Sequence, residues 1–391
     1  MEKKLKFPND FFWGSSTSSY QVEGGIDNSN WSKDFPAGVA CDHYNRYEED
    51  FDLLKSLNQN AYRFSIEWSR IEPEEGKFDQ KEIEHYKKMI LALKKRGIEP
   101  FVTLWHWTHP LWLEKKGGVF SNKFPYYFSR YAEQMVSFLG DDVKFWITIN
   151  ESESFATMSY LLGIWPPFKK NVFTFFSVMN SLIKSHINTY EIIKKKNPLA
   201  QVGVASNNNY YKADKNPISL IVKKVVALVD YFYILNRIKK YQDFIGLNYY
   251  LRVRVRGFSV IWETTGKKEK EPVSDVGWEI YPEGIYHVLK ILNRYKKPIY
   301  ITENGLADRQ DKFRKNFLRD HLHWIHKAMS DGIDVKGYLH WSFMDNLEWH
   351  KGFEPEFGLV NIDWKTLARI PRPSAYYYAK ICKNNELIIN E

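Results

Sequence analysis

Two glutamates of the chain directly follow short apolar segments, in the sequences TINES and ITENG, and they are Glu151 and Glu303. Two facing carboxyl groups are what glycoside hydrolysis requires, because one protonates the leaving oxygen while the other attacks the anomeric carbon or activates a water molecule. The distance between the carboxyl groups decides between these two routes, and the sequence does not give it. The pair predicts acid–base chemistry with its stereochemical course left open.

The first of these segments continues as TINESES and so holds a second glutamate, Glu153. Side chains two positions apart in an extended segment point to the same face, so Glu151 and Glu153 would share one. From this stretch alone either could be a catalytic acid, or neither.

Metal-assisted hydrolysis is the rival use of clustered carboxylates and histidines. His106 and His109 are three positions apart, as are His323 and His326, but no carboxylate or cysteine set completes either group. Nor does a Gly-x-Ser-x-Gly motif support a serine nucleophile. We therefore expect no metal and no required cofactor.

Eight strand-like runs, each ending in polar or aromatic residues, are separated by longer amphipathic stretches. They lie at 11–16, 61–68, 99–107, 144–150, 201–207, 244–250, 298–304 and 335–343. In one intervening stretch Ile83, Tyr86, Ile90 and Leu93 form an apolar helical face, and Gly97 marks its end. The pattern predicts an α/β protein with a single (β/α)8 TIM barrel over residues 1–391, ahead of a two-domain open sheet.

Catalytic groups of such barrels gather at the carboxyl ends of the strands. Taken singly, each polar residue there could be an ordinary core or capping residue, but together they form one predicted rim. They are Arg63, His106, Trp107, Asn150, Glu151, Asn207, Asn248, Tyr250, Glu303 and Trp341.

Composition limits the partners. The net charge of +9 comes from 56 basic and 47 acidic residues, without a basic stripe interleaved with aromatics, so we expect no nucleic-acid partner. The two cysteines, Cys41 and Cys382, lie far apart, and the chain contains neither a signal-peptide pattern at its start nor an uncharged apolar run of about 18 residues. These features predict a cytoplasmic protein without a membrane partner, and they leave the oligomeric state open.

Nine motifs resemble glycoside hydrolase family 1, the β-glucosidase and β-galactosidase family, in order and over nearly the whole chain. They are FFWGSSTSSYQVEGG, YRFSIEWSRIEP, TLWHWTHP, TINE, DFIGLNYY, GWEIYPEG, PIYITENG, GYLHWSFMDNLEWHKGF and FGLV. The resemblance implies a single (β/α)8 barrel that hydrolyses β-D-glycosides or oligosaccharides with retention, through a covalent glycosyl-enzyme.

Carried over position by position, the resemblance makes Glu303 the nucleophile and Glu151 the general acid/base. Arg63, Tyr250 and Asn248 would support the charged nucleophile. The resemblance also implies a set of sugar-binding residues: Gln21, His106, Trp107, Asn150, Trp341, Glu348, Trp349 and Phe357. Glu153 lies past the strand end, where alternation need not persist, and is expected in a loop or helix start.

The carboxylate of Glu348 suits neutral sugar hydroxyls and would repel a 6-phosphate, whereas the phospho-glycosidase branch of the family carries serine and lysine in this region. The resemblance thus implies an unphosphorylated substrate. A relative that only binds sugars, or an enzyme that mainly transglycosylates, remains an alternative.

Three departures from the family pattern stand out. Ser152 occupies the position of a usual proline, which should relax the extended backbone that aims Glu151. The chain is short between Glu151 and Asn248, which predicts a thinned barrel wall with a more open cleft or an additional ligand there. The sequence GIWPPFKKN also differs, which leaves the aglycone preference open.

Overall fold

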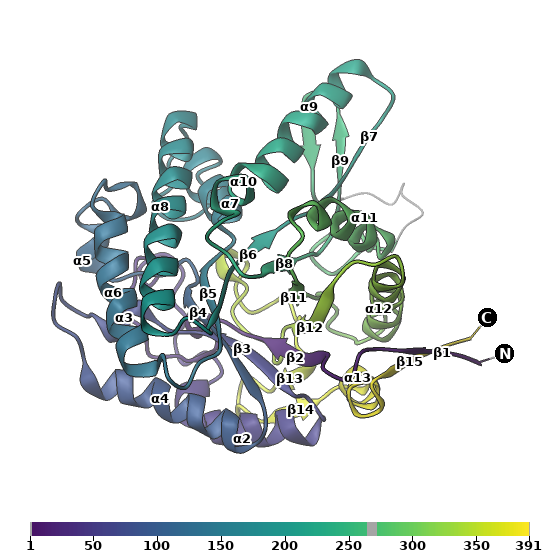
Figure 1. Cartoon of the computed structure of the whole chain (residues 1–391), viewed down its shortest axis with the longest axis horizontal. Helices are drawn as coiled ribbons and strands as arrows, with labels where there is room; N and C mark the ends of the chain where they lie inside the picture. Colours follow the sequence, from purple (N-terminus) through teal and green to yellow (C-terminus); the bar gives the residue numbers. More distant parts are fainter. Residues whose placement is uncertain (1, 264–271, 391) are drawn as a thin grey trace.

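The computed structural model describes residues 2–263 and 272–390, and its centre is a closed barrel of eight parallel strands (Figure 1). Around the barrel they run in the order β11-β12-β2-β3-β4-β5-β6-β8. Their bounds are β2 (Phe12–Ser16), β3 (Ala61–Ser65), β4 (Glu99–Trp105), β5 (Phe145–Asn150), β6 (Gln201–Asn207), β8 (Ile245–Asn248), β11 (Ile299–Asn304) and β12 (Val335–Trp341). Each falls within a predicted run, so the single (β/α)8 barrel is confirmed and the open sheet is wrong.

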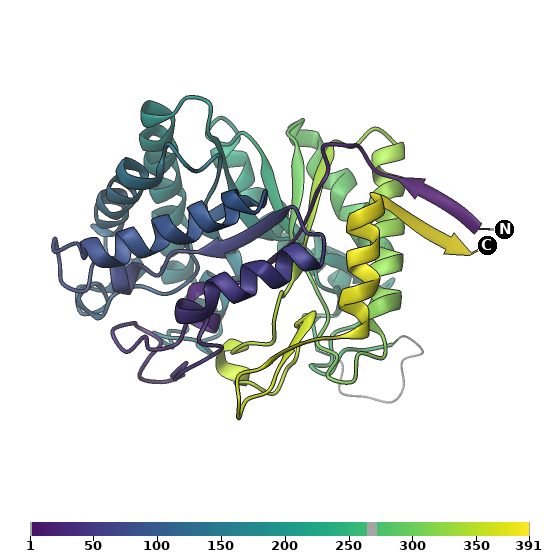
Figure 2. The same ribbon diagram turned by 90° about the horizontal axis from the view of Figure 1, so that it is seen from below.

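Helices surround the barrel on the outside (Figures 1 and 2). The larger ones are α2 (His43–Ser56), α4 (Gln80–Lys95), α6 (Phe124–Leu139), α8 (Val172–Lys196), α9 (Pro217–Leu228), α11 (Glu283–Leu292), α12 (Arg314–Ser330) and α13 (Pro373–Asn384). The short helices are α1 (Ser19–Val22), α3 (Trp68–Ile71), α5 (Leu111–Glu114), α7 (Ser152–Ala156) and α10 (Leu235–Ile238). None of the helices described is long and apolar enough to cross a bilayer.

Helix α4 shows how the sequence sets these boundaries. Asp79 caps its first turn, because its carboxylate accepts hydrogen bonds from the backbone N–H groups of Lys81 (2.8 Å) and Glu82 (3.4 Å). Ile83 and Leu93 lie on its buried face, as predicted. Gly97 follows with a φ of 69°, which the chain needs to leave the helix.

Aromatic side chains fill the lower half of the barrel interior. Phe101 and Phe145 stack at 4.3 Å, and Tyr300 and Phe244 pack edge-on against them. Together with Ala61, Ile147, Ala205 and Leu339 they form one buried cluster. The barrel therefore has a closed floor, and polar side chains are left to the carboxyl-end half.

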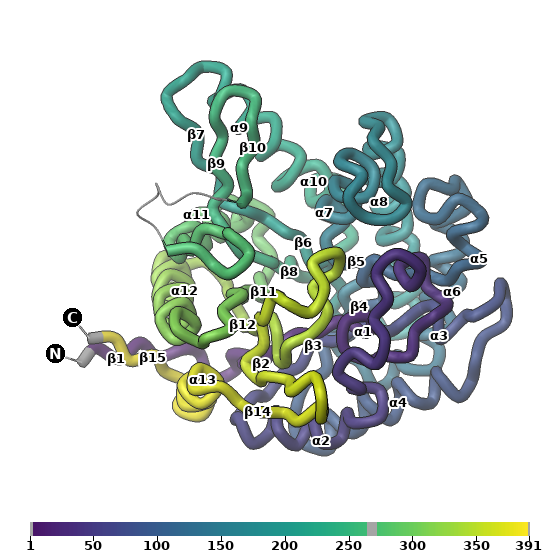
Figure 3. The backbone as a smooth tube through the Cα atoms, turned by 180° about the vertical axis from the view of Figure 1, so that it is seen from behind, coloured from purple at the N-terminus to yellow at the C-terminus, as the bar shows by residue number. Residues whose placement is uncertain are grey.

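Smaller sheets lie outside the barrel. Strands β7 (Tyr210–Ala213), β9 (Arg252–Arg256) and β10 (Ser259–Ile261) form a three-stranded sheet that carries α9, and both extend well beyond the ring of helices (Figure 3). The other two are antiparallel pairs of strands, β1 (Glu2–Lys6) with β15 (Glu386–Asn390) and β13 (Val360–Ile362) with β14 (Arg369–Pro371). The connection from β6 to β8 thus contains β7, α9 and α10, and it forms the wall predicted to be thin.

Candidate active site

Two β-bulges at the carboxyl ends of β5 and β11 aim polar side chains into the barrel. In β5 the regular alternation that places Ile147 inside would turn Asn150 outward, but the register with β6 shifts between them. In β11 a shift between Ile301 and Glu303 does the same for Glu303. An extra residue in a strand reverses the side-chain direction beyond it, so both bulges serve the site.

The carboxylate of Glu303 is buried and held by two donors. Arg63 on β3 forms a charge-assisted hydrogen bond to Oε1, and the Tyr250 hydroxyl donates to Oε2 at 2.6 Å. Burial raises the pKa of Glu303, while Arg63, Tyr250 and Asn248 act in the opposite direction by stabilising the carboxylate. The predicted support residues thus all act on this one carboxyl group.

Glu151 is also buried, and it has a different environment. Asn248 donates to its Oε1 at 2.7 Å, and the Ser154 hydroxyl also stabilises its ionised form. Burial, together with the charge of Glu303, raises the pKa of Glu151 well above its usual value. Of the two carboxyl groups, Glu151 is therefore the one whose protonated form is favoured more strongly.

The backbone of Glu151 is not extended, although the family's proline at the position of Ser152 leads us to expect an extended backbone there. Its φ and ψ are 41° and 61°, in the left-handed region, and its N–H donates to the carbonyl of Ala205 at 2.7 Å. This hydrogen bond holds a conformation that costs energy for a non-glycine residue. A proline at Ser152 would disfavour the conformation, so serine suits the backbone found here.

Glu153 lies in the first turn of α7, which confirms the expected helix start. It points away from the pair and accepts hydrogen bonds from the Ser206 hydroxyl (2.8 Å) and the Asn207 N–H (2.5 Å). Burial raises its pKa to about 7. Asn207, predicted at the rim, thus binds Glu153 instead of joining the central pair.

Asn150 connects the remaining polar residues. Its amide oxygen accepts from Arg63 at 2.6 Å and from Asn248 at 3.2 Å, its amide nitrogen lies 3.1 Å from His106 Nε2, and its carbonyl accepts from the Trp107 indole at 3.0 Å. Every one of these residues was predicted at the rim, and the structure brings them together.

Gln21 lies on the other side of the opening. Its side chain donates to the Leu347 carbonyl at 2.6 Å and to Asn346 at 3.0 Å, and accepts from Ser18 at 2.6 Å. These bonds fix the amide beside the segment that carries Glu348 and Trp349.

Aromatic rings form a wall next to these polar groups. His106 stacks on Trp349 at 5.8 Å and on Trp341 at 6.0 Å, and Phe357 belongs to the same cluster as Trp341. Trp165 packs on Trp107 at 4.5 Å. Sequence reasoning singled out the GIWPPFKKN segment but missed Trp165 itself, whose indole ring was the available signal.

Glu348 stands at the edge of this wall and is partly exposed. Loss of hydration, followed by the charge of Glu303, raises its pKa to about 8, and Lys351 opposes this shift. Glu348 is therefore mostly protonated at neutral pH and can both donate and accept hydrogen bonds.

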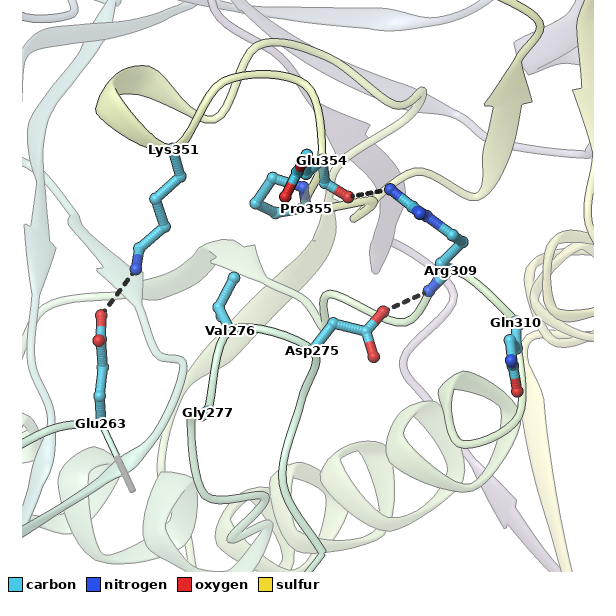
Figure 4. Close-up of a pocket in the computed structure, with 9 residues that line it drawn as sticks. All are labelled: Glu263, Asp275, Val276, Gly277, Arg309, Gln310, Lys351, Glu354 and Pro355. Carbon is cyan, nitrogen blue, oxygen red and sulfur yellow. Dashed lines mark hydrogen bonds and ion pairs between the residues drawn. The ribbon is translucent and has the colours of Figure 1, made fainter. Parts of the chain in front are cut away.

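A polar pocket of about 800 Å³ adjoins the wall (Figure 4). Lys351 pairs with Glu263 across it at 2.9 Å, and the Arg309 N–H donates to Asp275 at 2.7 Å. Val276 lines the pocket and also packs in the cluster with Trp341. The described residues that line it include neither Glu151 nor Glu303, so it lies beside the central site. An additional ligand in the wall between β6 and β8 stays a prediction.

The histidines of the two pairs contact other partners in the structure. His109 Nε2 lies 2.9 Å from Glu114 while His106 contacts Asn150, and His326 contacts the Lys6 carbonyl. Within residues 2–263 and 272–390, no group of three or more His, Cys, Asp and Glu side chains could hold a metal ion. Both cysteines are buried free thiols.

Comparison with known proteins gives consistent matches. The model of glycosyl hydrolase family 1 matches residues 3–227 and 234–387. The chain is 36% identical to β-glucosidase A of Acetivibrio thermocellus, over 98% of this chain and 99% of that protein. It is 30% identical to a 6-phospho-β-galactosidase of Staphylococcus epidermidis, over 99% and 100%.

Solved structures agree with these sequence matches. A β-glycosidase from Pyrococcus horikoshii superimposes with a TM-score of 0.93 at 38% identity, over 98% of this chain and 96% of that one. A β-glucosidase from Thermotoga maritima in complex with glucoimidazole superimposes with a TM-score of 0.90 at 32% identity, over 97% of this chain and 99% of that one.

Proposed function

The chain belongs to glycosyl hydrolase family 1 and is a retaining glycoside hydrolase, and from this premise we propose that Glu303 is its nucleophile and Glu151 its general acid/base. The observation that carries this proposal is the unequal environment of the two carboxyl groups. Glu303 accepts from a guanidinium and a phenol, whereas the side-chain donors to Glu151, the Asn248 amide and the Ser154 hydroxyl, are uncharged.

In the first step Glu303 attacks the anomeric carbon, and Glu151 transfers its proton to the departing glycosidic oxygen. The new bond turns Glu303 into an ester and removes its negative charge. Since that charge is one cause of the raised pKa of Glu151, the pKa falls, and Glu151 stays ionised once its proton has left.

In the second step Glu151 takes a proton from a water molecule, which attacks the anomeric carbon and releases Glu303 as a carboxylate. Two inversions give net retention. The two carboxyl groups and one water molecule account for every proton and bond in this scheme, and we propose that no cofactor is required.

The surrounding residues hold the sugar ring. Arg63 and Asn248 hold the side chain of Asn150, which in this proposal bonds the 2-hydroxyl, where hydrogen bonds strengthen in the transition state. Polar side chains along the aromatic wall bind the other ring hydroxyls, and aromatic side chains pack against the faces of the sugar ring. These residues are Gln21, His106, Trp107, Trp341, Glu348, Trp349 and Phe357.

The proposed substrates are unphosphorylated β-D-glucosides, with β-galactosides and β-fucosides as further members of the class. β-Glucosidases are among the similar proteins. A 6-phospho-β-galactosidase is also similar, and for this chain the ionised form of Glu348, which forms as the pH rises through about 8, would repel a phosphorylated sugar.

Tyr250→Phe is expected to move the acid limb of the kcat/KM profile to higher pH by about one unit. The Tyr250 hydroxyl stabilises the ionised form of Glu303, so its loss raises the pKa that governs this limb. The alkaline limb, which follows Glu151, should stay nearly in place. Initial rates across pH with an aryl β-D-glucoside measure both limbs, and an unchanged acid limb would show that the bond does not tune Glu303.

Discrimination against a 6-phosphoglucoside is expected to increase as the pH rises through about 8, because Glu348 then becomes ionised. The measurement is the ratio of kcat/KM for the aryl β-D-glucoside to that for its 6-phosphate, from pH 6 to 9. Limbs common to both substrates cancel in this ratio. Glu348→Gln should flatten it, and a flat ratio in the unmodified enzyme would remove Glu348 from phosphate discrimination.

The function is tested by a panel of aryl β-D-glycosides: glucoside, galactoside, fucoside and 6-phosphoglucoside. Hydrolysis of the first three supports the assignment, whereas activity on none of the four contradicts it. Adding an alcohol or sugar acceptor and analysing the products distinguishes hydrolysis from transglycosylation, which shares the covalent intermediate.

A further inference from the structure

Helix α9 presents an apolar face to solvent. Ile221, Val225 and Leu228 are between 57% and 62% exposed, Ile218 lies on the same side of the helix, and Leu220 is 45% exposed. The opposite side, which packs on β7 and β9, is apolar as well. A helix that is apolar all round is ordinarily buried on all sides, so the outer face of α9 is unusual.

Two neighbouring segments extend this face. The turn between β9 and β10 is tied to α9 by a hydrogen bond from the Gly257 N–H to the Ser219 hydroxyl (2.7 Å), and Phe258 at its tip is 82% exposed. The start of α8 contacts the helical turn after α9 through Phe176 and Tyr233 at 5.4 Å. Phe173, also 82% exposed, lies on that first turn of α8.

We call the exposed apolar side chains of these three segments, residues 161–176, 210–228 and 256–263, the apolar crest. Figures 1 and 3 show α9 with β7 and β9 standing out from the barrel. A monomeric enzyme rarely exposes so many large apolar side chains together unless they meet a partner.

The crest is strongly basic. Its three segments contain seven Lys and Arg residues but two Asp and Glu residues, and one of these acids, Glu263, pairs with Lys351 at 2.9 Å. Lysines beside the apolar side chains, among them Lys169, Lys170 and Lys224, are exposed. Aliphatic and aromatic side chains flanked by lysines are typical of segments that lie in the interface of an anionic membrane.

We propose that the apolar crest docks the enzyme on an anionic lipid surface. The apolar side chains enter the region between headgroups and acyl chains, and the lysines bind the anionic headgroups. A second copy of the chain fits less well, because a symmetric dimer would bring two basic surfaces against each other. The prediction of no membrane partner addressed spanning segments, and docking of this kind needs none.

Docking would also orient the enzyme. All three crest segments follow barrel strands β5, β6 and β8, so they lie at the carboxyl end of the barrel, where Glu151 and Glu303 are found. The opening of the site would then face along or toward the lipid surface.

Flotation with vesicles tests the proposal. The probe is phosphatidylcholine vesicles with and without about one third phosphatidylglycerol, at low and high salt. The variant carries Ile221→Gln, Val225→Gln and Leu228→Gln. The control carries Ile370→Gln, Val39→Gln and Leu199→Gln, which changes the same residue types at exposed positions outside the crest (51% to 83% exposed).

The unmodified enzyme and the control should float with the anionic vesicles at low salt, and the crest variant should lose about tenfold or more of its partitioning. Aryl-glycoside hydrolysis in solution should stay equal in all three proteins, which shows that they are folded. No binding to anionic vesicles, or equal binding by the crest variant, would overturn the proposal. The proposal would also be overturned if light scattering showed a concentration-dependent dimer in the unmodified enzyme and the control but not in the crest variant.

Discussion

Replacing Glu303 with Gln is expected to lower kcat/KM for an aryl β-D-glucoside by about 10⁴-fold or more. The amide cannot attack the anomeric carbon, and among residues 2–263 and 272–390 no other carboxyl group bonds Arg63 or Tyr250. Steady-state rates measure the loss, and the burst of aryl alcohol that marks the covalent intermediate should disappear as well.

A second variant with a smaller side chain, Glu303→Gly, tests whether activity can be restored by an added nucleophile. Azide can occupy the space left by the carboxylate and should restore turnover, with a product of inverted, α configuration. Thermal melting controls for the fold, since Arg63 keeps its bond to Asn150 when Glu303 is lost. Rates within tenfold of the unmodified enzyme would show that another group is the nucleophile.

Glu151→Gln is expected to lower kcat for substrates with poor leaving groups by about 10²–10⁴-fold. For substrates whose aryl leaving group needs no protonation, the rate of the first step should fall less. The glycosyl-enzyme should then accumulate, because its hydrolysis needs Glu151 as a base. Azide should release that intermediate as a β-glycosyl azide. The configuration of the azide product thus assigns the two glutamates separately.

Glu153→Gln is the matched control, because it makes the same change two residues further on. Its amide oxygen can still accept from Ser206 and Asn207, so kcat should stay within about threefold. Loss of its charge should slightly lower the pKa of Glu151 and move the alkaline limb to lower pH. If azide rescued Glu153→Gln and not Glu151→Gln, Glu153 would be the general acid/base and Glu151 would not.

The sequence predicted the eight strands because their apolar runs and polar ends are local features. It could not predict how Asn150 and Glu303 face the barrel, because simple alternation turns both side chains outward. The two bulges that reverse them depend on pairing with distant strands. The left-handed backbone of Glu151 likewise rests on a carbonyl of β6, which the TINES segment does not contain.

Tertiary contacts explain the other differences. Trp165 lies in a segment without clear periodicity, and only folding brings it against Trp107. The sequence of α9 is typical of a buried helix, yet its outer face is exposed. Burial of a whole segment depends on what the rest of the chain places over it.

The closed aromatic floor of the barrel determines the order in which the two products are released. Because Phe101, Phe145 and Tyr300 fill one end of the barrel, we expect sugar and aglycone to leave by the other end, with the sugar bound deeper. The aglycone must depart before water can enter, and the free sugar leaves last. Free sugar should therefore compete with the substrate for the empty enzyme, whereas the aglycone alcohol binds the glycosyl-enzyme and inhibits noncompetitively.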